Sequence, residues 1–379
     1  MSNTQKKNVP ELRFPGFEGE WEEKKLGEVA KIYDGTHQTP KYTNEGIKFL
    51  SVENIKTLNS NKYISEEAFE KEFKIRPEFG DILMTRIGDI GTPNIVSSNE
   101  KFAYYVSLAL LKTKNLNSYF LKNLILSSSI QNELWRKTLH VAFPKKINKN
   151  EIGKIKINYP KKQEQQKIGQ FFSKLDRQIE LEEQKLELLQ QQKKGYMQKI
   201  FSQELRFKDE NGEDYPDWKE KKLEDIIKVN SGKDYKHLDN GDIPVYGTGG
   251  YMTSVSEPLS EIDAVGIGRK GTINKPYLLE APFWTVDTLF YCTPKKEADI
   301  LFILSLFREI NWKVYDESTG VPSLSKQTIN KINRFVPTNK EQQKIGQFFK
   351  KIDNKIKIQK QVIELLKKRK KTLLQKMFI

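Results

Sequence analysis

The chain has 379 residues, in which 65 Lys and Arg side chains outnumber 50 Asp and Glu side chains, giving a formal net charge of +15. This length predicts at least two domains, and the charge favours a polyanionic partner such as nucleic acid. The single Cys292 excludes internal disulfides and cysteine-cluster metal sites. The first residues, MSNTQKKNVPELRF, contain no apolar stretch typical of a signal peptide, and no run approaches eighteen apolar residues. We therefore expect a soluble, cytoplasmic protein that makes no membrane contact.

Residues 1–163 predict a first mixed α/β domain. Short apolar runs broken by turns, such as GIKFLSVENI, GDILMTRIGDIGT and FAYYVSLALL, are typical of strands. A helical pattern follows in SYFLKNLILSSSIQNELWR, and a strand-like INYP comes after it.

The segment DGTHQTPKYT at 34–43 is polar, rich in turn residues and placed just after the first strand. Paired donors and acceptors on loops held by a rigid frame are what base reading requires. The alternative is an ordinary solvated loop. The candidate base or phosphate contacts of this domain, including an arginine next to the paired glycines of GDIGT, are Thr36, His37, Gln38, Lys41, Tyr42 and Arg86.

Residues 164–203 begin with EQQKIGQFF and predict a long helix, about 38 residues or roughly 57 Å. Its apolar residues follow the alternating spacing of four and three that is typical of a helix–helix seam. Packing on its own domain is the simpler alternative. The predicted interface residues, with one glutamate in an otherwise apolar row, are Ile168, Phe172, Leu175, Ile179, Glu182, Leu186 and Leu189.

Residues 204–340 predict a second domain on the same plan, because ELRF and W-x-E-K-K-L recur at its start. Its loop NSGKDYKHLDNGD at 230–242 stands where 34–43 stands in the first domain. The glycines of AVGIGRKGTI match a dinucleotide-binding pattern, but the following β-leaning TINKPYLL favours a tight turn between strands. The candidate contacts of this domain are Lys233, Tyr235, Lys236, His237, Arg269 and Lys270.

Residues 341–379 repeat the long helix, and 21 of 38 aligned positions are identical to those from residue 164 onward. The predicted helix at 164–203 leads from the first domain to the second. The predicted helix at 341–379 leads back towards the ELRF of the first domain. The two helices are therefore predicted to be antiparallel, with Glu182 opposite Lys370 and Lys193 opposite Gln359. The second set of interface residues is Ile345, Phe349, Ile352, Ile356, Ile363, Leu366 and Lys370.

Motifs for catalysis are absent from the sequence. The three histidines are scattered, and there is no H-E-x-x-H, G-x-S-x-G or G-K-[ST]. The N-P-P-[FY] motif with which aminomethylating enzymes hold an extruded base is also missing. A recognition or scaffold protein is favoured over an enzyme.

The repeated frame resembles the specificity (S) subunit of type I restriction-modification systems over nearly the whole chain. The features that carry the resemblance are W…KKLGEV at 21–29, YTNEGIKFLSVENI, FGDILMTRIGDIG, and EQQKIGQFF followed by a heptad helix. The resemblance implies an α+β fold with two target-recognition domains, 1–163 and 204–340. Two long antiparallel helices, 164–203 and 341–379, would form a coiled-coil spacer in a pseudo-two-fold circular repeat.

The same resemblance implies a non-catalytic subunit that recognises double-stranded DNA, each domain reading one half of a split, asymmetric site. The helices would set the gap between the halves and dock two copies of the modification (methyltransferase) subunit. S-adenosylmethionine is then expected on those partners, and ATP and Mg²⁺ on partner restriction subunits, with no cofactor or metal on this chain. The alternative is a stand-alone DNA-binding regulator without such partners.

Overall fold

A computed structural model describes residues 8–38, 40–113 and 115–379. The chain divides into two compact units. Unit 1 comprises Met1–Glu183 with Val362–Ile379, and unit 2 comprises Gln184–Gln361. Each unit therefore contains one recognition domain together with one part of each long helix.

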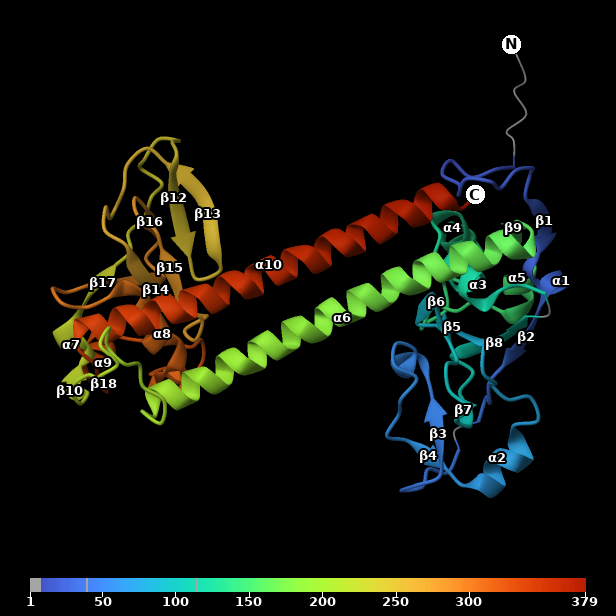
Figure 1. Cartoon of the computed structure of the whole chain (residues 1–379), viewed down its shortest axis with the longest axis horizontal. Coiled ribbons are helices and arrows are strands. Elements are labelled where there is room, and N and C mark those ends of the chain that lie inside the picture. The colour runs from blue at the N-terminus through green and yellow to red at the C-terminus, as the bar shows by residue number, and fades with distance from the viewer. Residues whose placement is uncertain (1–7, 39, 114) are drawn as a thin grey trace, which may run out of the picture. The chain divides into compact units, whose positions relative to one another are not determined.

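The strands of unit 1 form two sheets and a separate pair (Figure 1). The larger sheet has the antiparallel order β2-β8-β5-β6, and in the smaller sheet, β4-β3-β7, strand β3 runs antiparallel to β4 and parallel to β7. Strand β1 pairs antiparallel with β9. The bounds are β1 Glu22–Lys25, β2 Ala30–Asp34, β3 Ile47–Leu50, β4 Tyr63–Ile64, β5 Ile82–Ile87, β6 Asp89–Ile95, β7 Phe102–Tyr104, β8 Leu108–Thr113 and β9 Lys156–Tyr159.

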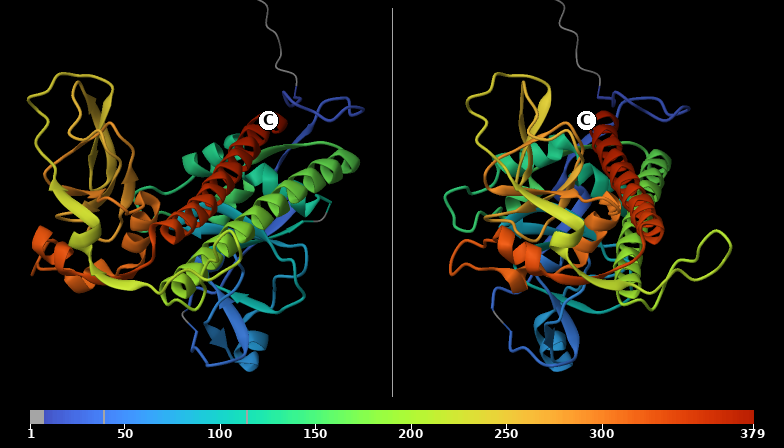
Figure 2. Two further views of the ribbon diagram at one scale, coloured as in Figure 1. Left: turned by 60° about the vertical axis from the view of Figure 1, so that its left-hand side comes forward. Right: turned by 90° about the vertical axis from the view of Figure 1, so that its left-hand side faces the viewer.

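The central strands of the larger sheet are apolar at consecutive positions because both of their faces are covered. Ile82 and Met84 of β5 pack into the core that includes α3, whereas Leu83 between them packs into the core of the smaller sheet. The smaller sheet and α2 lie on the side of the larger sheet away from α6 (Figures 1 and 2). The helices of unit 1 are α1 Leu26–Val29, α2 Glu66–Glu72, α3 Ser118–Ile125, α4 Ser128–Arg136 and α5 Lys149–Gly153, with a 3-10 turn η1 at Val52–Asn54.

Unit 2 repeats this plan strand for strand. Its larger sheet is β11-β17-β14-β15, its smaller sheet is β13-β12-β16 with β12 parallel to β16, and β10 pairs with β18. Alternate residues of β14 again enter two different cores, Val265 and Ile267 on one face and Ala264 on the other. The strands are β10 Lys219–Lys222, β11 Ile227–Ser231, β12 Ile243–Gly247, β13 Gly250–Val255, β14 Ala264–Gly268, β15 Tyr277–Leu279, β16 Trp284–Thr285, β17 Leu289–Pro294 and β18 Asn333–Val336.

The helices of unit 2 match only part of those in unit 1. Helices α7, α8 and α9 stand where α1, α3 and α5 stand in chain order, while unit 1 additionally has α2 and α4. Side chains cap the helices that follow the larger sheets, because Asn117 accepts from the Phe120 N–H and Asp299 accepts from the Phe302 N–H. The bounds are α7 Leu223–Ile226, α8 Ile300–Glu309 and α9 Lys326–Lys331, with η2 at Trp312–Tyr315.

Two long helices complete the units: α6, Lys162–Phe201, has 40 residues and α10, Asn339–Met377, has 39. In unit 1, Lys370 lies 2.5 Å from Asp176 and Lys367 lies 2.6 Å from Glu183. A higher residue number on α6 is paired with a lower residue number on α10, so the helices are antiparallel in this unit, as predicted.

The residues predicted for the helix seam are covered to different degrees. Those at the start of each helix and near the end of α10 are buried, namely Ile168, Phe172, Leu175, Ile179, Ile345, Phe349, Ile363 and Leu366. Those nearer the helix centres are half-buried, namely Glu182, Leu186, Leu189, Ile352 and Ile356.

The ion pairs of the two lysines differ from the predicted layers, in which Lys370 stands opposite Glu182 and Lys193 opposite Gln359. Lys370 binds Asp176, and in unit 2 Lys193 lies 2.5 Å from Asp353. Asp176 and Asp353 flank the apolar row without belonging to it, and a long lysine side chain reaches along the helix to them. The two ion pairs are copies of each other, since each residue recurs 177 positions later.

Candidate nucleic-acid interface and the joints that support it

The glutamate of each EQQKIGQFF segment is buried and binds an arginine from the preceding ELRF. In unit 1, Glu164 accepts hydrogen bonds of 2.7 Å from both Nε and Nη2 of Arg13. This bidentate contact raises the pKa of the Arg13 guanidinium, because hydrogen bonding to the carboxylate favours its charged form. The domain start is thereby fixed to the helix start.

Unit 2 repeats this contact and adds a third donor. Glu341 accepts from Arg206 Nη2 at 2.8 Å and from Nε at 3.3 Å, and also from Trp218 Nε1 at 3.1 Å. Among the residues that the structure describes, the equivalent indole nitrogen of Trp21 has no hydrogen-bond partner. Sequence reasoning missed both arginines, although the repeated ELRF was the signal that could have found them.

The first glutamine of each segment satisfies backbone groups at the same joint. Gln165 accepts from the Asn117 N–H and donates to the Pro160 carbonyl. Gln342 does the same with Asp299 and Pro337. Each side chain thus ties the long helix to the start of α3 or α8 and to the strand before it.

The glycine of each segment permits a close approach between helices. A Cβ at Gly169 would lie 2.6 Å from Asn117 Oδ1, and a Cβ at Gly346 would lie 2.6 Å from Asp299 Oδ1. Both distances are shorter than a nonbonded contact allows. Any larger residue here would push the long helix off the helix cap.

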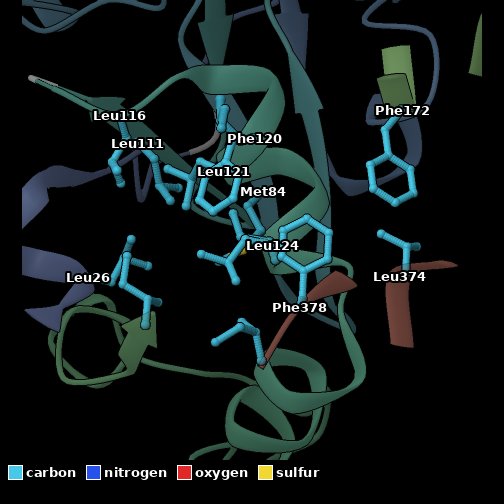
Figure 3. Close-up of a cluster of buried hydrophobic side chains, with 14 of the residues drawn as sticks. Leu26, Met84, Leu111, Leu116, Phe120, Leu121, Leu124, Phe172, Leu374 and Phe378 are labelled. Atoms are coloured by element: carbon cyan, nitrogen blue, oxygen red, sulfur yellow. The ribbon is translucent and has the colours of Figure 1, made fainter. Parts of the chain in front are cut away.

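The C-terminal segment closes unit 1 with the same contacts that run along the chain in unit 2. The Leu12 N–H donates to the Lys376 carbonyl at 2.8 Å, and Leu205 donates to Lys199 at 3.0 Å. Phe378 packs edge-on against Trp21 and lies against Phe120 and Phe172 in the core shown in Figure 3. Phe201 makes the matching contacts in unit 2, with Trp218 and Phe302. The circular order of the repeats is therefore completed in space.

The loop after β2 in unit 1 holds most of the predicted contacts on the surface. His37, Gln38, Lys41 and Tyr42 are exposed, while Thr36 is half-buried and its hydroxyl bonds to the backbone of Gln38. The Thr36 backbone also bridges to Tyr104 and Val106, which fixes the base of the loop to β7. Thr39, within the same stretch, lies outside the described residues.

Arg86 is not at an exposed turn, contrary to the prediction. It lies near the end of β5, where its side chain is 6% exposed, forms an ion pair with Asp34 and donates to the Ile147 carbonyl. Of the paired glycines, Gly88 forms the turn between β5 and β6 and Gly91 lies within β6, while Arg86 is directed inward from the strand. Its role in the structure is to hold the end of β2 and the segment at Ile147 together.

The loop after β11 in unit 2 is the positional equivalent of the loop after β2. Lys233, Lys236 and His237 are exposed, and Tyr235 is half-buried against the core of the smaller sheet. Trp284 Nε1 donates to the Lys233 carbonyl at 2.9 Å, and the His237 ring stacks edge-on to Trp284. The base of this loop is therefore held by an indole that the first loop lacks.

Arg269 and Lys270 follow β14 at a turn and are exposed, as predicted. Arg269 lies over the Phe290 ring at 5.8 Å, and the strand that follows, β15, pairs antiparallel with β14. This is a turn between strands, so the dinucleotide-binding interpretation of its glycines does not apply. In unit 2 the arginine is at the surface, whereas its equivalent in unit 1, Arg86, is buried.

A family model described as the type I restriction modification DNA specificity domain matches residues 18–191 and 215–368. Each match begins after the arginine of the joint and takes in most of one recognition domain and most of the long helix that follows it. The chain belongs to this family. The specificity subunit is 25% identical over 423 residues to the type I restriction enzyme MjaVIII specificity subunit of Methanocaldococcus jannaschii, covering 97% of this chain and 93% of that protein.

Solved structures share the fold of this specificity subunit. The S subunit of a type I restriction-modification system from M. genitalium superposes with a TM-score of 0.68 at 20% identity, covering 98% of this chain and 99% of that one. A chain from a structural study of complex assembly and conformational transition in the type I R-M system gives 0.53 at 14% identity, covering 96% and 97%. Two recognition domains of mixed helix and sheet, each with its share of two long helices, are the architecture of the specificity subunit.

No helix in the described part of the chain combines the length and apolar character needed to cross a bilayer. Within residues 8–38, 40–113 and 115–379, no group of three or more His, Cys, Asp or Glu side chains is placed to hold a metal ion.

Proposed function

We propose that each recognition domain of this specificity subunit reads one half of a split, asymmetric double-stranded DNA site. The observation that carries the proposal is a duplicated scaffold with unlike loops. Both units use the same glutamate, glutamine and glycine contacts at their joints. The loops that follow β2 and β11 differ in length and in nearly every side chain.

The position of these loops suits base reading. Each leaves the first strand of the larger sheet and enters the first strand of the smaller sheet, so both of its ends are rigid. Exposed polar side chains on such a loop can present paired donors and acceptors to base edges, while nearby lysines bind phosphates. Two unlike loops on one scaffold favour two unlike half-sites.

The long helices carry exposed apolar residues suited to binding partner subunits. In unit 1, Leu181 of α6 is 47% exposed and Leu365 of α10 is 66% exposed. In unit 2 their repeats, Leu188 and Ile358, are 54% and 58% exposed. Leu181 matches Ile358 and Leu188 matches Leu365 at the 177-residue offset. This symmetry favours two copies of one partner, the modification subunit.

Under this proposal the specificity subunit recognises DNA and performs no chemistry. Methylation with S-adenosylmethionine belongs to the modification subunits, and ATP- and Mg²⁺-dependent steps belong to restriction subunits. The unbroken α6 and α10 set the length of the gap between the half-sites.

The test is to co-express the chain with its modification subunits and map the methylated adenines in the host DNA. We expect a two-part sequence with an unspecific gap, and exchanging residues 34–43 should alter one half only. Inserting a heptad within 181–190 should alter the gap and neither half. Sequence-specific binding by the chain alone, without methylation in the complex, would favour a stand-alone regulator.

Partner docking is tested with Leu365→Ser, which should reduce co-purification of the modification subunit. Lys357→Ser, at another exposed position of α10, is the matched control. If both variants co-purify the modification subunit in the wild-type yield, docking at Leu365 is contradicted.

A further inference from the structure

The loop between α4 and α5 of unit 1 exposes two large apolar side chains at its tip. Val141 is 99% exposed and Phe143 is 104% exposed, as in an extended peptide, so neither side chain packs against the protein. Isolated exposed apolar residues are common on protein surfaces. A fully exposed phenylalanine at the end of an ordered loop needs a further explanation.

The loop is anchored at its base to the turn between β5 and β6. The Leu139 N–H donates to the Lys146 carbonyl at 2.8 Å, and the Gly88 N–H donates to the Lys145 carbonyl at 2.8 Å. The Ile147 carbonyl accepts from Arg86 Nε, the buried arginine described above. The tip is therefore presented on a fixed base.

Three side chains beside the loop contact one another, with two rings in an edge-on arrangement. The rings of Trp135 and His140 are 4.3 Å apart, and Lys145 Nζ lies 4.7 Å above the Trp135 ring. His140 Nε2 is 3.0 Å from the Trp135 carbonyl. These contacts join the residues before and after Phe143, and a tip held in place in this way needs less ordering when it binds.

The charge around the tip favours a polyanion over an apolar protein surface. Between Glu133 and Glu151 there is no acidic residue in the sequence. Of the basic residues in this interval, Arg136, Lys137 and Lys149 form ion pairs with Glu133, Glu151 and Asp34 at the base of the loop. Lys145 and Lys146, which follow Phe143 and Pro144, form no ion pair with the described residues and supply the positive charge beside the tip. Apolar side chains flanked by lysine and arginine are the combination with which proteins enter a groove of DNA and part adjacent base pairs.

The equivalent loop of unit 2 has the same base but a different tip. Gly271 donates to the Pro322 carbonyl at 2.8 Å and Leu324 to the Arg269 carbonyl at 2.9 Å, matching the bonds made at Gly88 and Ile147. Its tip has Gly320 where unit 1 has Phe143. Near its start, Asp316 accepts from the N–H groups of two serines, which lowers the pKa of its carboxyl group. An aromatic tip with basic neighbours is thus a property of unit 1.

We infer that Phe143 is a wedge that inserts between stacked base pairs of the half-site bound by unit 1. This inference rests on the proposed function and adds a deformation of the DNA to it. Parting a base step costs less at flexible steps, so the wedge would select sequence without a hydrogen bond to any base.

The experiment uses the full chain in complex with its modification subunits. Duplexes carrying the half-site found by methylation mapping are substituted with 2-aminopurine at one position after another. We expect the wild-type complex to raise the fluorescence several-fold at one step, because the probe loses a stacking neighbour. Phe143→Ala should abolish that rise and weaken binding about tenfold. Phe143→Leu, which keeps an apolar tip, should retain part of both effects.

Phe79→Ala is the matched control, since Phe79 is also exposed in unit 1 but lies outside this loop. It should leave the fluorescence and the affinity unchanged. An unaltered fluorescence rise in Phe143→Ala would overturn the wedge, as would a loss of modification-subunit binding by that variant in the absence of DNA. A wild-type complex that neither methylates nor binds DNA would instead overturn the proposed function.

Discussion

Removing the buried glutamate should cost more in unit 2 than in unit 1. Glu164→Ala leaves Arg13 without its carboxylate, and because Arg13 is only 17% exposed we expect a loss of about 2–3 kcal/mol. Glu341→Ala does the same to Arg206, which is 21% exposed, and also orphans the Trp218 indole N–H. One additional hydrogen bond to a charged group is worth about 1.5–3 kcal/mol, so the second variant should be the less stable by about that amount.

Unfolding in urea is monitored by hydrogen exchange with mass spectrometry, because the stability of each of the two units must be measured separately. Exchange protection in unit 2 should fall further in Glu341→Ala than protection in unit 1 falls in Glu164→Ala. Trp218→Phe provides the second half of a double-mutant cycle and should reduce the difference. Equal losses of exchange protection in Glu164→Ala and Glu341→Ala would refute the reasoning, as would the absence of coupling between Glu341 and Trp218.

Three further outcomes follow from the joints and loops. Gly346→Ala should destabilise unit 2 by about 1–3 kcal/mol, because its Cβ would press on Asp299. Gly195→Ala, which has open space around it, should instead stabilise unit 2 by about 0.5–1 kcal/mol, and urea titration distinguishes the two variants. Phe378→Ala should lower the stability of unit 1 by about 3 kcal/mol and spare the exchange protection of unit 2. The pKa of Asp316 is lowered in the fold, so its stabilisation of residues 316–323 is present above the ordinary aspartate value of 3.8 and is lost as pH falls through the lowered pKa; amide NMR shifts should titrate there.

Exact repeats in the sequence were a good guide to the scaffold. The order of ELRF and EQQKIGQFF predicted a circular arrangement, and the contacts of Leu12 with Lys376 bear it out within unit 1. The antiparallel direction of the helices followed from the same order. Such predictions succeed because a repeated string must solve the same packing problem twice.

Side-chain partners were less accessible to sequence reasoning. The apolar row predicts Lys370 opposite Glu182, but the ion partner of Lys370 is Asp176 beside the row. Arg86 follows the same pattern, since its burial depends on Asp34 of a strand that is distant in sequence. Nothing in the sequence distinguishes a core phenylalanine from one at a loop tip such as Phe143.

The division of unit 1 into two stretches of chain has a consequence for biosynthesis. All of unit 2, Gln184–Gln361, is contiguous, whereas unit 1 also needs Val362–Ile379. A ribosome must therefore translate unit 2 before Phe378 can enter the cluster around Trp21 and Phe120. The domain made first is therefore completed last, when Phe378 enters its core.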